Sequence, residues 1–223
     1  MDEDIALIIP AYNEVETIGE VIEVAQKSNL FNEIVVVSDG SEDGTAKKAL
    51  EYDVKTIALP KNLGKGAAMT IGMKNTLSEI ILFLDADLVS LREEHIKNLL
   101  TPLIEGRADM SCGLFSGGRE NTDFAQRLTP YLTGQRALRR GLVNSYEELR
   151  DSKFGAELYL TKLAIEQELK VEKVFLEGLT HRMKEEKRGF IKGIISRLKM
   201  YWEVFEYFKR NNLSYHSLSS TIK

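Results

Sequence analysis

Short apolar runs alternate with longer amphipathic segments through residues 5–84. The apolar runs are IALIIP, EIVVVS, KTIALP and EIILFL, and the segments between them cover residues 14–27, 44–52 and 64–76. Runs that are apolar on both faces predict buried parallel strands, and the segments between them predict crossover helices. The alternation therefore predicts an α/β domain whose mostly parallel sheet is covered by helices on both faces.

The rest of the chain is less regular. SLREEHIKNLLTPLIEG predicts a helix, ADMSCGLF a strand, FGAELYLTKLAIEQEL a helix and KVEKVFLEGL a last strand. Residues 116–140 are basic and aperiodic, so we expect an irregular segment there. A chain of 223 residues is long enough for one substantial core. We divide it into a domain over residues 1–188 and a C-terminal helix and tail over residues 189–223.

The first helix is predicted to begin near Asn13. Asn13 is a favourable N-cap residue, and Glu16 follows three positions later, as in a capping box. The amino terminus of this helix would then face the crevice that forms at the carboxyl ends of parallel strands.

Four polar motifs follow the four predicted strands. They are PAYNE at 10–14, SDGSEDGT at 38–45, KNLGKGAA at 61–68 and DAD at 85–87. The carboxyl ends of parallel strands meet at one edge, so we expect the motifs to share a crevice. Each alone has a plainer interpretation as a turn or a helix cap, because Asp, Ser and Gly favour turns for local reasons. KNLGKGAA lacks the GxxxxGK[ST] spacing of a Walker loop.

Asp85 and Asp87 lie one residue apart at the end of a buried strand. Residues i and i+2 of an extended chain point to the same side, so the two carboxylates repel each other unless a positive group lies between them. Hard divalent cations bind carboxylate and phosphate oxygens, which makes Mg²⁺ or Mn²⁺ the natural candidate. Capping of the following helix is the alternative.

The four motifs, in this order, resemble those of the family-2 nucleotide-sugar glycosyltransferases of the GT-A fold, most closely over residues 4–90. The resemblance implies an enzyme that uses Mg²⁺ or Mn²⁺ to move a sugar from a UDP- or GDP-sugar to a hydroxyl or phosphate acceptor. Polyprenyl-phosphate glycosyltransferases and glucosyl-3-phosphoglycerate synthases are the similar subfamilies, so the acceptor is expected to be a lipid phosphate or a phosphorylated small molecule.

The resemblance also implies site residues. Asp39 would accept a hydrogen bond from the base, and Lys65 would offset the charge of the diphosphate. Asp85 would bind the ribose or a metal-bound water. Asp87 would be the catalytic metal ligand, and His181 in GLTHRM would complete the metal shell. The nucleotide-sugar site as a whole would comprise Pro10, Ala11, Tyr12, Glu14, Asp39, Gly40, Lys65, Gly66, Asp85 and Ala86.

LTGQRALRR at 132–140 resembles the acceptor loop of the same subfamilies. Thr133, Gly134, Gln135 and Arg136 would contact sugar hydroxyls and a phosphate there, and a basic helix start is the alternative. Glu157 in FGAEL stands where inverting members place their catalytic base, but GAEL resembles the retaining members equally well. Inversion and retention both stay open, and an ionised phosphate acceptor needs no strong base.

Three histidines occur in the chain. Besides His181, His95 falls on a predicted helix and His216 in a polar tail, and we interpret both as structural or solvent-facing.

Composition narrows the location and the partners. A formal net charge of −4 argues against a general nucleic-acid binder. The single Cys112 cannot form an internal disulfide, and MDEDIALII lacks the features of a signal peptide, so we expect a cytoplasmic protein. No apolar run reaches the roughly 18 to 20 residues that cross a bilayer.

Residues 190–208 place aromatic and aliphatic side chains on one helical face. This amphipathic helix would either pack on the core or on a partner subunit of a homodimer, or lie on the anionic inner surface of a membrane. The two interpretations favour a soluble and a lipid acceptor respectively. The alternative to an enzyme is a non-catalytic nucleotide-sugar-binding or scaffold protein.

Overall fold

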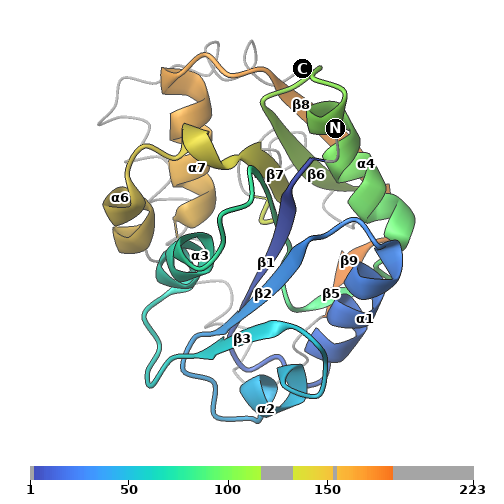
Figure 1. The fold of residues 1–223 in the computed structure, drawn as a ribbon, viewed down its shortest axis with the longest axis vertical. Helices are drawn as coiled ribbons and strands as arrows, with labels where there is room; N and C mark the ends of the chain where they lie inside the picture. Colours follow the sequence, from blue (N-terminus) through green and yellow to red (C-terminus); the bar gives the residue numbers. More distant parts are fainter. Residues whose placement is uncertain (1–2, 117–132, 153–154, 183–223) are drawn as a thin grey trace, which may run out of the picture.

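The computed structural model describes residues 3–116, 133–152 and 155–182 (Figure 1). The domain boundary predicted at residue 188 and the amphipathic segment 190–208 lie outside the described residues. Within the described ranges, every helix is too short or too polar to cross a bilayer.

A seven-stranded sheet forms the centre of the molecule (Figure 1). β7 runs antiparallel to both of its neighbours, and the other pairs of adjacent strands are parallel. The predicted fold class, a mostly parallel α/β sheet of the GT-A kind, is confirmed. In spatial order the strands are β3 (Lys55–Ala58), β2 (Glu33–Ser38), β1 (Ile5–Ala11), β4 (Ile80–Phe83), β7 (Arg136–Arg139), β6 (Met110–Ser116) and β8 (Val171–Glu177).

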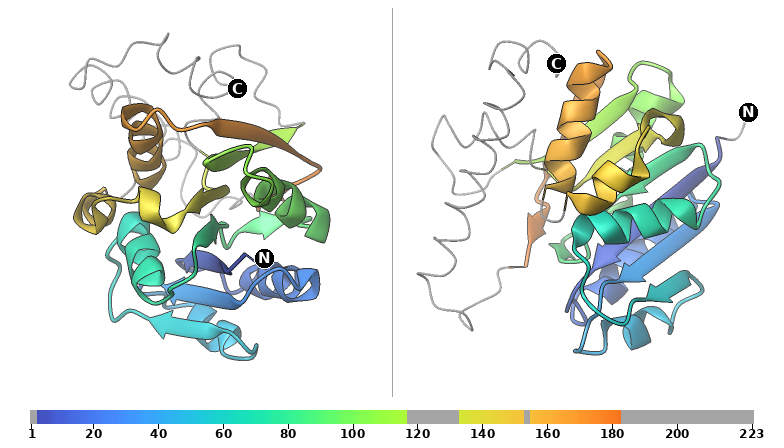
Figure 2. Two further views of the ribbon diagram at one scale, coloured as in Figure 1. Left: turned by 45° about the horizontal axis from the view of Figure 1, so that its top comes forward. Right: turned by 90° about the vertical axis from the view of Figure 1, so that its left-hand side faces the viewer.

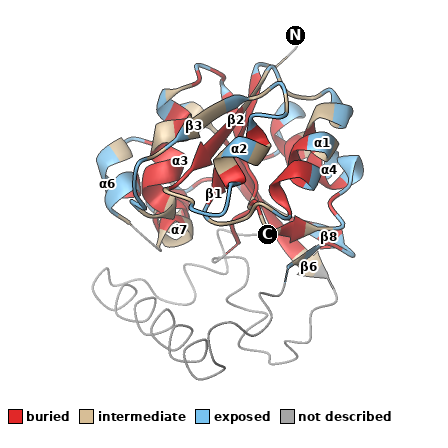
Figure 3. Ribbon diagram, turned by 90° about the horizontal axis from the view of Figure 1, so that it is seen from below, coloured by how far each residue is buried: buried red, intermediate tan, exposed pale blue. Residues whose placement is uncertain are grey.

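Helices cover both faces of the sheet and enclose two separate cores (Figures 2 and 3). Alternate side chains of β1 enter different cores: Leu7 and Ile9 the first, Ala6 and Ile8 the second. This two-sided burial explains why β1 is apolar throughout. The first core is covered by α1 (Ile18–Ser28), α2 (Thr45–Ala49) and α4 (Glu93–Ile104), and the second by α3 (Lys65–Lys74), α6 (Tyr146–Asp151) and α7 (Ala156–Glu166).

β7 corrects the expectation of an irregular segment over residues 116–140. Residues 136–139 pair with β4 and residues 136–138 also pair with β6, and Ala137 and Leu138 are fully buried. Because arginines occupy both ends of this four-residue strand, the sequence lacks the continuous apolar run by which a buried strand is recognised. Residues 117–132 lie outside the described residues.

The antiparallel direction of β7 matters for the site. Phe83 of β4 pairs with Arg136, so the residues just before β7 lie beside the residues just after β4. An antiparallel strand thus brings residues 133–135 to the edge where the parallel strands end.

The prediction that the first helix begins near Asn13 is wrong. α1 begins at Ile18, and Thr17 precedes it. Asn13 has a φ of 57°, a left-handed conformation that cannot start a right-handed helix. Its side chain accepts a hydrogen bond from another loop instead.

Two further short strands form a separate ribbon. β5 (Leu88–Val89) follows the DAD motif, and β9 (Thr180–His181) follows β8. They pair in antiparallel fashion, with Leu88 opposite His181. The ribbon brings His181 next to the aspartates, although 94 residues separate it from Asp87.

Candidate active site

The loops after β1 and β2 hold each other at the carboxyl edge of the sheet. The N–H of Asn13 donates to Ser41 Oγ at 3.1 Å, and the N–H of Glu42 donates to Asn13 Oδ1 at 2.9 Å. The N–H of Glu14 donates to Thr45 Oγ1 at 2.8 Å. The PAYNE and SDGSEDGT motifs therefore form one connected surface.

Asp39 joins this surface to the KNLGKGAA loop. Its carboxylate is 3% exposed and accepts from the N–H groups of Leu63, at 2.7 Å, and Gly64, at 2.8 Å. Gly40, next to it, has a φ of +68°, and a Cβ there would lie 2.3 Å from the backbone nitrogen of Asn62. The predicted hydrogen bond between Asp39 and a base stays a prediction. Each carboxylate oxygen of Asp39 already accepts from one N–H of the KNLGKGAA loop, so a base N–H would have to use a remaining lone pair.

An ion cluster lies between the third and fourth motifs. Lys65 is the first residue of α3, and its Nζ lies 2.5 Å from Asp85 Oδ1 and 2.5 Å from Glu157 Oε1. The second oxygen of Asp85 accepts from Gln135 Nε2 at 2.9 Å. Two distant segments of the chain, those of Lys65 and Gln135, thus converge on Asp85, and Glu157 joins them through Lys65.

The cluster shifts the pKa values of two of its members. Burial by itself would lower the pKa of Lys65, but the charges of Asp85 and Glu157 outweigh it and raise that pKa well above its usual value. Burial would likewise raise the pKa of Asp85, but Lys65, with help from His181 and Gln135, lowers it overall. Lys65 and Asp85 are therefore both charged at neutral pH.

Gly134 packs directly on this cluster. A Cβ at this position would lie 2.5 Å from Asp85 Oδ2 and 2.6 Å from Lys65 Nζ. Any side chain at this position would therefore have to displace Asp85 or Lys65.

Asp85, Asp87 and His181 form a candidate metal site. Each offers one ligand atom, and these atoms lie within 4.8 Å of one another. His181 Nδ1 lies 3.0 Å from Asp87 Oδ1, and the His181 ring packs edge-on against Phe115, with 4.6 Å between ring centroids. Burial by itself would lower the pKa of His181, but the hydrogen bond and the charge of Asp87 outweigh it and raise it. Two carboxylates and an imidazole suit a cation such as Mn²⁺.

Arg136 corrects the expected acceptor site. Its side chain is 1% exposed, so it cannot reach an acceptor phosphate as predicted. Its Nε donates to the carbonyl of Thr133 at 3.0 Å and its Nη2 to Thr161 Oγ1 at 2.9 Å. Thr133 and Gln135 are also buried, and Thr133 Oγ1 donates to the carbonyl of Gly113 at 2.6 Å. These three side chains build the floor of the site rather than its open side.

Gly66 also has a structural explanation. A Cβ there would lie 2.2 Å from the carbonyl oxygen of Leu149 and 2.4 Å from Ser152 Oγ. Glycine at 66 therefore lets α3 approach α6, whereas the resemblance places it in the nucleotide-sugar site.

Four other residues predicted to bind the nucleotide sugar lie along the same edge of the sheet. Pro10 and Ala11 are buried at the end of β1, Ala86 is buried within the DAD motif, and Tyr12 is 45% exposed in the loop after β1. Tyr12 is thus the aromatic side chain of this group that a ligand can reach.

Sequence reasoning missed the contact between Lys65 and Glu157. The two residues are 92 positions apart, and neither motif carries a signal for the other. It also missed that Gln135 binds Asp85, because an amide in a basic loop is equally suited to contact a sugar hydroxyl.

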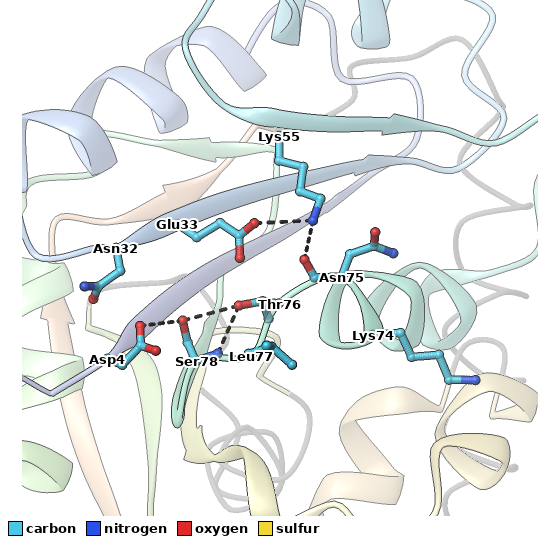
Figure 4. A pocket seen from close by; sticks show the side chains of 9 residues that line it. All are labelled: Asp4, Asn32, Glu33, Lys55, Lys74, Asn75, Thr76, Leu77 and Ser78. Carbon is cyan, nitrogen blue, oxygen red and sulfur yellow. Dashed lines mark hydrogen bonds and ion pairs between the residues drawn. The ribbon is translucent and has the colours of Figure 1, made fainter.

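A hollow of about 620 Å³ lies at the opposite edge of the sheet, lined by residues that include Asp4, Lys55 and Ser78 (Figure 4). The polar groups that line it bind one another: Ser78 Oγ donates to Asp4 Oδ1 at 2.8 Å, and Lys55 Nζ contacts Glu33 and the carbonyl of Asn75. The hollow is at the edge opposite the strand-end motifs, and several of its polar groups bind one another, so we do not assign it a ligand.

Comparison with known families gives one extensive match. The sequence model of the family described as Glycosyl transferase family 2 matches residues 6–161. The match covers the four motifs, Gly134 and Glu157, and it ends before β8.

Curated relatives match over a shorter stretch. A dolichyl-phosphate beta-glucosyltransferase of Drosophila melanogaster is 36% identical over 100 residues, which cover 38% of this chain and 31% of the relative. A glucosyl-3-phosphoglycerate synthase of Mycolicibacterium smegmatis is 30% identical over 109 residues, which cover 45% of this chain and 36% of the relative. The matched part of the chain spans about a third of the length of these relatives.

A solved structure extends the similarity to most of the fold. Glucosyl-3-phosphoglycerate synthase from Mycobacterium tuberculosis, in complex with Mn²⁺, UDP-glucose and phosphoglyceric acid, superimposes with a TM-score of 0.68 at 26% identity. The superposition covers 87% of this chain and 76% of that chain.

Proposed function

Because the chain belongs to glycosyl transferase family 2, we propose that it transfers a sugar from a nucleoside-diphosphate sugar to a phosphorylated acceptor, with Mn²⁺ or Mg²⁺ as cofactor. The observation that carries the proposal is the group formed by Asp85, Asp87 and His181, whose ligand atoms lie within 4.8 Å of one another. This group lies at the edge where the strand-end loops meet, which is where α/β sheets bind their ligands.

The charges of the site support a divalent cation. Asp85, Asp87 and Glu157 bring three negative charges and Lys65 brings one positive charge, which leaves −2 when His181 is neutral. A divalent ion held by Asp87 and His181 would balance this charge, and when bound it would stabilise the nucleoside diphosphate as a leaving group. Asp85 is already engaged by Lys65 and Gln135, so we assign it to the ribose or to a metal-bound water.

The donor is proposed to lie across the loops after β1, β2 and β3. Tyr12 offers an exposed ring for stacking, and Asp39 offers an acceptor for a base N–H. The structural relative binds UDP-glucose, which makes a UDP-sugar the first donor to test. A GDP-sugar is the second.

The acceptor is proposed to carry a phosphate. The relatives named above act on dolichyl phosphate or on phosphoglycerate, according to their names, and both molecules share this group. Glu157 pairs with Lys65 at 2.5 Å, so we propose that Glu157 positions this lysine rather than removing a proton from the acceptor. A lipid phosphate that attacks as the nucleophile is already ionised and needs no such base, whereas a hydroxyl nucleophile would have to give its proton to another group, such as the departing diphosphate.

The test measures nucleotide binding and turnover separately. We expect Mn²⁺-dependent binding of UDP, and release of UDP from UDP-glucose that increases when phosphoglycerate or a polyprenyl phosphate is added. Asp87→Ala should abolish both, whereas Asp53→Ala, which removes an exposed carboxylate, should change neither. Binding without any turnover would favour the non-catalytic alternative, and no Mn²⁺-dependent nucleotide binding would refute the proposal.

Location and oligomeric state stay predictions. The segment predicted to decide between a membrane surface and a protein partner, residues 190–208, lies outside the described residues. Sedimentation of the full chain with anionic vesicles at low salt tests the membrane contact, and sedimentation velocity without vesicles tests the homodimer.

A further inference from the structure

The ribbon that carries His181 is too short to be stable by itself. β5 and β9 have two residues each, with Leu88 opposite His181 and Val89 opposite Thr180. Isolated two-stranded ribbons are marginal in water, and a slip of one residue would turn the imidazole to the opposite face. Contacts outside the ribbon must therefore fix its register.

One end of the ribbon is fixed at the candidate metal site. The N–H of Arg182 donates to the carbonyl of Asp87 at 2.8 Å, and His181 Nδ1 lies 3.0 Å from Asp87 Oδ1. A cation bound by Asp87 and His181 would replace the second of these contacts. The position of the imidazole in the loaded site then depends more strongly on the other end of the ribbon.

The other end is fixed by the start of α4. The carbonyl oxygen of Glu177, the last residue of β8, accepts from Arg92 Nη2 at 2.7 Å and from His95 Nε2 at 3.0 Å. Arg92 directly precedes α4, and His95 lies in the first turn of that helix. The residue after Glu177 is Gly178, with a φ of +75°, where the chain turns into β9. We call Arg92, His95 and the Glu177 carbonyl the ribbon clamp.

The ribbon clamp has a defined proton arrangement. His95 Nδ1 accepts from the backbone N–H of Arg92 at 3.2 Å, which favours a neutral ring with its proton on Nε2, the atom that lies 3.0 Å from the Glu177 carbonyl and 2.9 Å from Arg92 Nη2. His95 is 2% exposed. Burial lowers its pKa, and the charge of Arg92 acts in the same direction, which keeps the imidazole neutral.

The turn between the ribbon clamp and His181 is packed rather than loose. Leu179 is 3% exposed and belongs to the same core as Leu88, Leu91 and Ile96. Its N–H donates to the carbonyl of Leu176 at 3.4 Å. A displacement of Glu177 would therefore be passed along the turn to β9.

We propose that Arg92 and His95 are positioning residues for His181, and that the ribbon clamp sets the affinity of the site for its divalent cation. This inference rests on the proposed function, because it assumes that Asp87 and His181 hold the cation. Neither Arg92 nor His95 belongs to the motifs that marked the site in the sequence.

The experiment titrates Mn²⁺ into the full chain and follows the electron paramagnetic resonance signal of free Mn²⁺, with and without UDP. Arg92→Ala and His95→Gln should each raise the dissociation constant for Mn²⁺ about tenfold, the lower end of what partners of metal ligands contribute. Arg92→Lys, which keeps a donor for the Glu177 carbonyl, should restore part of the affinity.

Two control variants separate positioning from stability. Arg107→Ala removes an arginine that pairs with Glu105 and Glu172 on the surface, and it should leave Mn²⁺ affinity unchanged. Leu103→Val, in the last turn of α4, should lower the melting temperature without changing Mn²⁺ affinity.

The outcomes that overturn the inference differ from those that overturn the proposed function. If Asp87→Ala and His181→Ala weaken Mn²⁺ binding but Arg92→Ala and His95→Gln do not, the ribbon clamp is only structural. If Asp87→Ala and His181→Ala also have no effect, the metal site itself is wrong and the inference fails with it.

Discussion

A single methyl group added at Gly134 should disable the site while the fold survives. The Cβ of Gly134→Ala would lie 2.5 Å from Asp85 Oδ2 and 2.6 Å from Lys65 Nζ, about 0.5 Å inside the 3.0 Å that real Cβ atoms keep. Asp85 cannot retreat freely because Gln135 holds its second oxygen at 2.9 Å. Lys65 cannot either, because Glu157 holds its Nζ at 2.5 Å. The methyl group must therefore displace the ion cluster.

The size of the effect follows from this displacement. Overpacking of a close-packed site costs about 1–3 kcal/mol, so we expect the free energy of unfolding to fall by about 1–2 kcal/mol. Misplacement of a catalytic group by about 1 Å costs about a hundredfold in rate, and a shift of at least half that size should slow sugar transfer by about tenfold or more. The effect on turnover should thus exceed the effect on stability.

The assay compares Gly134→Ala with Gly141→Ala by urea unfolding, by Mn²⁺-dependent UDP binding and by UDP release from UDP-glucose. A Cβ at Gly141 has no other atom within 4 Å, so this variant controls for the loss of a glycine. Equal stability, binding and turnover in the two variants would refute the close packing of residue 134 against the ion cluster.

Other substitutions test the same cluster and its supports. Lys65→Met should lower the free energy of unfolding by about 2 kcal/mol, because it leaves two partly buried carboxylates, 17% and 14% exposed, without their shared partner. Lys48→Met on the surface should leave it unchanged, and an equal, small effect of both would contradict the ion cluster. Asp39→Asn should cost about 1–3 kcal/mol in urea unfolding, because an amide can satisfy only one of the two loop N–H groups that the carboxylate binds; full stability would show that the loop does not depend on this residue. In metal-free protein, His95 and His181 should give opposite pH dependences of stability between about pH 5 and 8. Because the pKa of His95 is lowered by folding, its contribution to the free energy of unfolding is present above pH 6.5 and is lost as the pH falls below that value. Because the pKa of His181 is raised by folding, its contribution is present below pH 6.5 and is lost as the pH rises through its folded-state pKa. If the changes in stability caused by His95→Gln and His181→Gln depended on pH with the same sign, these assignments would be refuted.

Much of the fold could be predicted because its signals are local. β1, β2 and β4 are apolar on both sides, and a polar motif follows each of β1 to β4 at the carboxyl edge of the sheet, where the ends of parallel strands meet. The family-2 resemblance is confirmed by the match over residues 6–161. The position of His181 beside the aspartates also agrees with expectation, although its role as a ligand stays a prediction.

The rest depended on contacts that sequence patterns do not show. Asn13 has the chemistry of an N-cap, but Glu42 of a different loop takes its side-chain oxygen, and α1 starts at Ile18. Arg136 has the chemistry of a phosphate ligand, but the strand it begins is buried between β4 and β6. In both cases the residue type allowed two uses, and tertiary structure decided between them.

The opposite strand direction of β7 explains why these late segments reach the same point as the early motifs. The residues that follow a parallel strand lie at the carboxyl edge, whereas for β7 the residues that precede the strand lie there. Gln135, just before β7, therefore meets Asp85, just after β4. The short ribbon does the same for His181 and Asp87. The repulsion between the two aspartates is therefore relieved unequally. Asp85 has a permanent cation in Lys65. Within the part of the chain that the structure describes, Asp87 pairs only with an imidazole, which can lose its proton, so it is Asp87 that gains most from a divalent ion.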